Sequence, residues 1–169
     1  MNAHRAYNVL FVDTGNSTRS ILAEVIMNRL GAGKFKAYSA GVAPKGEIHP
    51  QTMKLLHSLH HSTDNLRSKS WDEFAGADAP QFDFVITVCD EAAALAQPEW
   101  AGQPLHSHWS VPDPAGPAAS DVDMALAFAD AYRMLNNRIG IFVNLPFEKL
   151  DALALQERMD SIGGDRAHT

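Results

Sequence analysis

The sequence holds a single cysteine, Cys89, among its 169 residues. One thiol excludes an internal disulfide and a cysteine-rich zinc site, and it confines thiol chemistry to one position. Positive charge is also scarce, since 14 Lys and Arg face 20 Asp and Glu and leave a net charge of −6. This balance argues against a nucleic-acid-binding face. A small anion can still be bound by a local cradle of backbone N–H groups.

Long apolar runs, internal repeats and low-complexity segments are absent as well. Only the short segment 1–6 precedes the first apolar run, Tyr7–Val12, and no window approaches the roughly 20 residues of a membrane span. We therefore expect a cytoplasmic protein with no membrane partner. The length and the 46% hydrophobic content predict one domain over residues 1–169, with a core at 8–145 and an extra C-terminal helix at 146–162.

Apolar runs and helical spacing alternate along the chain. The runs predict strands at 7–12, 36–40, 82–88 and 105–109, and the spacing predicts helices at 20–30, 50–59, 91–96, 121–143 and 146–162. Strands that are apolar throughout and alternate with helices indicate an α/β fold: a three-layer, four-stranded parallel sheet with helices on both faces. Ligands of such folds bind beyond the carboxyl ends of the strands, where the segment 13–20, Cys89 and the loop 112–114 fall.

The segment Asp13-Thr-Gly-Asn-Ser-Thr-Arg-Ser20 follows the first strand and admits four interpretations. An aspartic protease would need a second Asp-Thr-Gly copy and a nearly all-β scaffold. A phosphate loop of the actin or sugar-kinase type should run into a hairpin rather than a helix. An ordinary turn would use Ser17 and Ser20 only as helix caps. Arg19 favours an oxyanion cradle for phosphate, sulfate or arsenate, because its planar fork joins the loop N–H groups at a helix N-terminus.

Several segments resemble low-molecular-weight protein tyrosine phosphatases and the related thioredoxin-coupled arsenate reductases, over residues 8–151. The phosphate loop of that family reads Cys, five residues, Arg, Ser, and the segment 13–20 matches it except at its first position. The other matching segments are Tyr38–Gly41, Leu66–Ser70, Phe84–Asp90, and His108-Trp109 through Asp113-Pro114. No tyrosine follows the Asp-Pro pair as in phosphotyrosine-specific members, so the arsenate-reductase-like branch fits better.

The resemblance implies a mechanism and a role for each matching residue. A loop thiolate would attack phosphorus or arsenic, Arg19 would bind the equatorial oxygens, and Asp113 would act as general acid. Asn16 would fix the turn and Ser20 would donate to the nucleophile. The oxyanion-binding segment would comprise Thr14, Gly15, Asn16, Ser17, Thr18 and Arg19, with no cofactor. For Asp113, a turn-forming residue between two prolines is the alternative.

The family's nucleophilic cysteine is replaced by Asp13. We expect an ionised carboxylate with a lowered pKa, drawn toward Arg19 and filling part of the anion site. An incoming dianion would meet a like charge, at a cost of roughly 4 kcal/mol at an intermediate dielectric. The sequence thus predicts an impaired arsenate reductase or phosphatase, restorable by Asp13→Cys. A non-catalytic regulatory or binding module of the same fold is the alternative.

The remaining candidates concern redox chemistry, metals and partners. Cys89 is either the middle cysteine of a redox relay or a buried strand-end thiol, and Gln97 stands where the relay's third cysteine is expected. Thioredoxin or small thiols would be the partners of a reductase. The histidines cluster at 57, 60 and 61 and at 106 and 108, but no Cys or carboxylate joins them at a metal-binding spacing, so we predict no metal. We expect a monomer or a weak dimer, because Leu150, Leu153 and Leu155 serve either an interface or the chain's own core.

Overall fold

The computed structural model of the chain describes residues 5–118 and 120–164. Its elements follow in the order β1 (Tyr7–Asp13), α1 (Arg19–Leu30), β2 (Phe35–Gly41), α2 (Pro50–Ser58), the 3-10 turn η1 (Trp71–Phe74), β3 (Phe84–Thr87), α3 (Asp90–Ala93), β4 (Leu105–His108), α4 (Asp121–Val143), the 3-10 turn η2 (Phe147–Lys149) and α5 (Ala152–Gly164). Each of the four expected strands is present, and β3 and α3 are shorter than expected.

The four strands form one parallel sheet in the order β2-β1-β3-β4. Residue Val9 of β1 is level with Ala37 of β2 on one side and with Phe84 of β3 on the other. The chain therefore leaves β1 toward β2 on one side and returns to β3 on the other side. Such a reversal opens a crevice at the carboxyl ends of the two central strands, and ligands of open α/β sheets bind there. The segment after β1 lies at that crevice.

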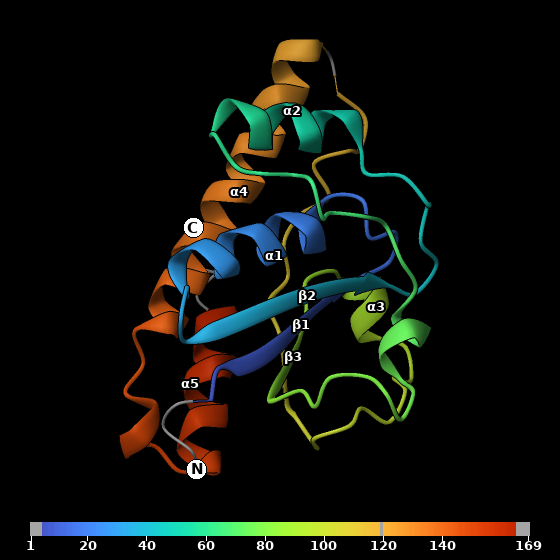
Figure 1. Cartoon of the computed structure of the whole chain (residues 1–169). Helices are drawn as coiled ribbons and strands as arrows, with labels where there is room; N and C mark the ends of the chain where they lie inside the picture. Colours follow the sequence, from blue (N-terminus) through green and yellow to red (C-terminus); the bar gives the residue numbers. More distant parts are fainter. Residues whose placement is uncertain (1–4, 119, 165–169) are drawn as a thin grey trace.

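Both faces of the sheet are buried, by different kinds of element. Val9 and Phe11 of β1 belong to a core cluster shared with α1, α4 and α5, whereas Leu10 and Val12 belong to a second cluster with η1 and α3. Figure 1 shows the long helices gathered on one side of the strands and the short α3 on the other. The expected fold class is confirmed, although one of its helical layers consists of single turns and loops.

Capping residues determine where helices α4 and α5 begin. Ser120 caps α4, since its side chain accepts a hydrogen bond from the backbone N–H of Asp123 at 3.1 Å. The expected helix start at Pro146 is wrong: a single 3-10 turn follows Pro146, and α5 begins at Ala152 after Asp151 accepts from the N–H of Ala154.

Among the described residues, no helix combines the length and the apolar character that a membrane span requires.

The C-terminal helix α5 packs on β4 and on the segment that follows it. The indole N–H of Trp109 donates to the carbonyl of Met159 at 3.0 Å, and the hydroxyl of Ser107 donates to Asp160 at 2.9 Å. Leu155 is buried in this contact, whereas Leu153 is exposed. A Cβ on Gly163 would lie 2.4 Å from the carbonyl oxygen of His108. The close approach of α5 to the strand therefore depends on that glycine.

We predict opposite effects for two Gly→Ala substitutions in helices. Gly163→Ala should lower the free energy of unfolding by about 1–3 kcal/mol, because the added methyl group overlaps backbone atoms that have little freedom to move. Gly140→Ala, in α4, is the matched control, since nothing lies within 4 Å of its added Cβ. That variant should gain up to about 1 kcal/mol from helix propensity. Urea denaturation of both variants and the native chain measures the difference, and equal effects would contradict the packing described.

Candidate functional site

The loop after β1 is held in place through its carbonyl groups. The backbone N–H groups of Val42, Ala43 and Lys45 donate to the carbonyls of Asp13, Thr14 and Gly15 at 2.8–3.0 Å. A peptide group points its C=O and its N–H in opposite directions, so the N–H groups of the loop face the other side. The loop and the end of β2 lie so close that a Cβ on Gly41 would come within 2.7 Å of the Thr14 carbonyl oxygen.

The side chain of Asp13 lies at the base of this loop, where only 2% of the residue is exposed. One carboxylate oxygen accepts from the backbone N–H of Asn16 at 2.7 Å, and the other accepts from the N–H of Ser20 at 2.9 Å. Thr18 is the N-cap residue of helix α1, but its side chain makes no capping hydrogen bond. The carboxylate of Asp13 therefore satisfies one first-turn N–H group of α1, that of Ser20, and one N–H group of the loop, that of Asn16.

The expected lowering of the Asp13 pKa is wrong. Burial raises the pKa of this carboxyl above its usual value, against the opposing effects of the Ser20 and Asn16 hydrogen bonds and the Arg19 charge. Desolvation outweighs those favourable contacts because the group has almost no access to water. The charge of Arg19 is the smallest of these named effects, and its guanidinium donates to the carbonyl of Val111 at 2.9 Å.

Asn16 ties the loop to two other parts of the chain. Its backbone has φ of 45°, a left-handed conformation that Asn tolerates better than most residues. Its side-chain amide donates to the hydroxyls of Ser20 at 2.7 Å and Ser39 at 3.1 Å, and its amide oxygen accepts from the N–H of Lys69 at 2.8 Å. Both Asn16 and Ser20 are fully buried. Their side chains therefore hold the loop from its protein-facing side.

Beneath Asn16 lies a pair of charged side chains that the sequence analysis did not identify. The hydroxyl of Ser39 donates to Glu24 at 2.6 Å, and the ammonium of Lys69 lies 3.8 Å from the same carboxylate and donates to the carbonyl of Arg67 at 2.9 Å. Burial raises the pKa of Glu24 and lowers that of Lys69. No motif marks these two residues as partners, because they are 45 positions apart and meet only through the fold.

A cavity of about 180 Å³ opens over the loop. Its lining comprises Asp13, Thr14, Gly15, Ser17, Thr18, Arg19, Ala43, Lys45, Glu91, Asp113 and Ala115. The sequence-predicted residues Arg19 and Asp113 are thus brought to one cavity from segments more than 90 residues apart. Asp113 is exposed, and its carboxylate also accepts from the N–H of Ala115 at 2.9 Å, as in a turn. Lys45 and Glu91 were missed, because neither belongs to a recognisable motif.

Cys89 adjoins the same cavity. Only 3% of the residue is exposed, and its sulfur lies 3.2 Å from the hydroxyl of Thr14. It also lines a neighbouring space of about 330 Å³ together with Arg19, Glu91 and Asp113. The thiol is therefore both buried at the end of a strand and next to the loop.

His57, His61 and His108, which the sequence singled out, bond to residues outside the loop 13–20. His57 and His61 bond to the hydroxyls of Thr63 and Tyr132, and His108 bonds to Asp90 at 2.7 Å and to Thr87. In the part of the chain that the structure describes, no three His, Cys, Asp or Glu side chains are grouped so as to hold a metal ion.

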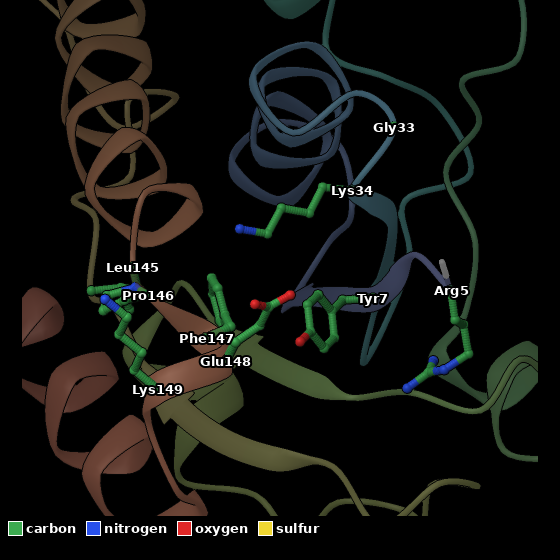
Figure 2. A pocket seen from close by; sticks show the side chains of 9 residues that line it. All are labelled: Arg5, Tyr7, Gly33, Lys34, Leu145, Pro146, Phe147, Glu148 and Lys149. Carbon is green, nitrogen blue, oxygen red and sulfur yellow. The ribbon is translucent and has the colours of Figure 1, made fainter. Parts of the chain in front are cut away.

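A larger cavity, of about 460 Å³, lies at the opposite edge of the sheet (Figure 2). It is lined by Tyr7 at the start of β1, by Lys34 just before β2 and by residues 145–149. The ammonium of Lys34 sits 4.9 Å from the centre of the Phe147 ring. Because this cavity is at the amino ends of the strands, it contains none of the loop donors described above.

Comparison with known proteins agrees with this geometry. Residues 8–152 match the family model of the low molecular weight phosphotyrosine protein phosphatases. The chain belongs to this family. In this chain, Asp13 occupies the position of the family's nucleophilic cysteine, and the only cysteine in the sequence is Cys89. The arsenate reductases and phosphatases of the family require no cofactor.

Similar proteins of this phosphatase family include several arsenate reductases. The glutaredoxin arsenate reductase of Synechocystis sp. is 32% identical over 64% of this chain and 79% of its own length. The arsenate reductase of Oceanobacillus iheyensis is 27% identical over 79% of this chain and 93% of its own. Among solved structures, an Archaeoglobus fulgidus arsenate reductase is 26% identical, with a TM-score of 0.60 over 78% of this chain and 98% of that one. The Wzb protein of Vibrio vulnificus, 20% identical with a TM-score of 0.63 over 86% and 100%, shares the fold.

The raised pKa of Asp13 predicts a specific pH dependence. A carboxyl whose pKa is higher in the folded state stabilises the fold at low pH, and this contribution is lost as the pH rises through the folded-state value. Between roughly pH 4 and 7, the free energy of unfolding of the native chain should therefore fall relative to that of Asp13→Asn. Urea denaturation of both proteins across this range measures the difference. A native chain that gains stability relative to the variant would instead indicate a lowered pKa.

Proposed function

We propose that this chain is an arsenate-reductase-like or phosphatase-like protein whose turnover is impaired by Asp13. The loop 13–20 is the oxyanion site and Asp113 is the general acid. The observation that carries this proposal is the position of the Asp13 carboxylate, with both oxygens bonded to loop N–H groups that would otherwise face a bound anion.

A carboxylate is a poor substitute for a thiolate at this place. A thiolate attacks as a single large, polarisable atom whose pKa is lowered by the loop, and it leaves the remaining N–H groups to the substrate oxygens. Enzymes that form an aspartyl phosphate offset the added charge with a metal ion. The residues around Asp13 provide Arg19 and Lys45 but no cluster of acidic metal ligands in the described part of the chain.

A non-catalytic binding or regulatory module is the second candidate, and one observation favours it. The carboxylate already acts as an internal anion at the N-terminus of α1, so the loop is complete without a ligand. A chain of this kind would keep the family's shape for recognition by a partner. The two candidates differ in whether the remaining catalytic groups still function once a thiol is restored.

The electron donor of a reductase belongs to the same proposal. The names of two relatives describe glutaredoxin-coupled and thioredoxin-dependent arsenate reductases, and a third relative has been solved in a phosphate-binding state. By analogy we propose that the loop of this chain takes phosphate, sulfate or arsenate, with thioredoxin or a small thiol as reductant. Gln97, where a third cysteine is expected, instead accepts a hydrogen bond from the Trp100 indole. That departure favours a small thiol.

Asp13→Cys should raise turnover of p-nitrophenyl phosphate by at least about 100-fold over the native chain, because the reacting atom alone is missing. Arsenate reduction by the same variant, assayed with glutathione and with a thioredoxin system, assigns the donor. Cys89→Ser added to this variant is the control: it should leave phosphate ester hydrolysis unchanged and abolish any reduction that passes through Cys89. Comparable turnover by the native chain would overturn the proposed impairment. An inert Asp13→Cys variant would favour the non-catalytic module.

The general-acid role of Asp113 is testable in the restored enzyme. Asp113→Asn in the Asp13→Cys background should lower kcat by about 10²–10⁴-fold for phenyl phosphate, whose leaving group needs a proton. The loss should be much smaller for p-nitrophenyl phosphate, whose leaving group is a weak base. Steady-state kinetics with the two esters measures both values. An equal loss for both esters would assign Asp113 to the turn after Pro112 rather than to proton transfer.

A further inference from the structure

A second cavity with the character of an anion site lies at the other end of α1. It has a volume of about 320 Å³ and is lined by Arg29, Leu59, His61, Tyr132, Arg133 and Asn136. These residues come from the end of α1, from the segment that begins at the end of α2, and from the middle of α4, so we call it the helix-junction cavity. Arg29 lies ten residues beyond Arg19 along α1, or about 15 Å at 1.5 Å per residue. The cavity is therefore separate from the loop.

The polar groups of the helix-junction cavity are held in position by one another. The guanidinium of Arg29 donates to the side-chain oxygen of Asn136 at 3.1 Å and contacts the Tyr132 hydroxyl at 3.4 Å. The same hydroxyl bonds to the ring Nε2 of His61 at 2.8 Å. These partners are neutral, so they fix the direction of Arg29 without cancelling its charge. A guanidinium held in this way loses less side-chain entropy when it binds a ligand.

The charge of the cavity is positive, although the chain as a whole is acidic. None of its lining residues is an Asp or a Glu, and among the described residues no carboxylate lies within ion-pair distance of Arg29. Arg133 has one such partner, Asp130, at 3.7 Å, and both side chains are more than half exposed. Exposed pairs of this kind contribute little. Burial and the charge of Arg29 lower the pKa of His61, so the positive charge of the cavity is carried by Arg29 and Arg133.

Several carbonyls at the helix ends near this cavity already accept hydrogen bonds. At the end of α2, the carbonyls of Leu55 and Leu56 accept from the N–H of Leu59, and Leu56 accepts from His61 as well. At the end of α1, the carbonyl of Met27 accepts from Gly31 at 2.8 Å. The side-chain donors that line the cavity are those of Arg29, Arg133 and the Asn136 amide.

We propose that the helix-junction cavity binds the phosphate group of a small molecule. The planar guanidinium of Arg29 matches two oxygens of a tetrahedral oxyanion, and Arg133 and His61 lie beside it to contact the others. Leu59 is 43% exposed at the rim, where it can contact an apolar substituent of the ligand. The site uses His61, one member of the histidine cluster of the sequence, and it does not depend on the identity of residue 13.

The test is a residue-resolved NMR titration of the native full-length chain with phenylphosphonate, which phosphatase activity cannot hydrolyse. The backbone signals of Arg29, Tyr132 and Asn136 and the ring signals of His61 should shift together and saturate. Phenol, which lacks the phosphonate, should leave them unchanged at the same concentration. Arg29→Met should weaken binding by about tenfold or more, because it removes the fork and keeps the apolar stem.

Arg158→Met is the matched control, since it removes an exposed arginine from α5 without touching the cavity; its dissociation constant should stay at the native value. Tyr132→Phe gives a milder second variant that retains the ring and removes the hydroxyl contacting Arg29 and His61. It should weaken binding less than Arg29→Met. Shifts confined to residues 13–20, shifts spread over surface lysines, or unchanged binding by both cavity variants would overturn the proposal. None of these outcomes depends on whether the loop turns over substrate.

Discussion

The structure depends on the two hydrogen bonds that join the Asp13 carboxylate to the N–H groups of Asn16 and Ser20. They close the loop after β1 and start helix α1, whose N-cap residue Thr18 makes no side-chain capping hydrogen bond. A loop of this shape gathers donors at a helix N-terminus, and in an enzyme of this family those donors face substrate. Here they face a side chain of the protein itself. Under the proposed function, the same contact that stabilises the loop would compete with substrate for its donors.

Groups other than Asp13 also hold the shape of the loop. From behind, Asn16 is bonded to Ser20, Ser39 and the backbone of Lys69, and from the side the loop carbonyls are bonded to the segment after β2. The Glu24 and Lys69 pair lies below this network and is largely buried. Replacing a buried charged pair by apolar residues is often neutral for stability, whereas removing one partner is costly. Such a pair is better explained by the fixed position that it gives to Ser39 and, through it, to Asn16.

The sequence predicted the parts of the molecule that depend on local pattern. The four strands, helix α1 and the start of α4 at the Ser120 cap follow from apolar runs and capping residues, and the motif around Arg19 gave the family. It failed where the outcome depends on burial or on contacts between distant segments. The pKa of Asp13 was expected to fall because the hydrogen bonds can be inferred from the loop, whereas its burial cannot. Lys45, Glu91 and the Glu24–Lys69 pair have no local signature, and Pro146 starts a turn rather than α5.

Burial also determines how Asp13 and an incoming oxyanion would affect each other. In water a carboxylate and a dianion can avoid each other at little cost, but in a loop with almost no solvent their repulsion is only weakly screened. Two like charges that share one site push each other toward protonation, so an arriving anion would raise the pKa of Asp13 further. A protonated Asp13 would in turn gain one O–H donor and lose part of its capacity to accept hydrogen bonds from the loop. If the loop binds an anion as proposed, then anion binding, proton uptake and the start of α1 would be linked through one carboxyl group. A cysteine would separate them, because a thiolate bonds the loop through one atom and leaves the other donors to the ligand.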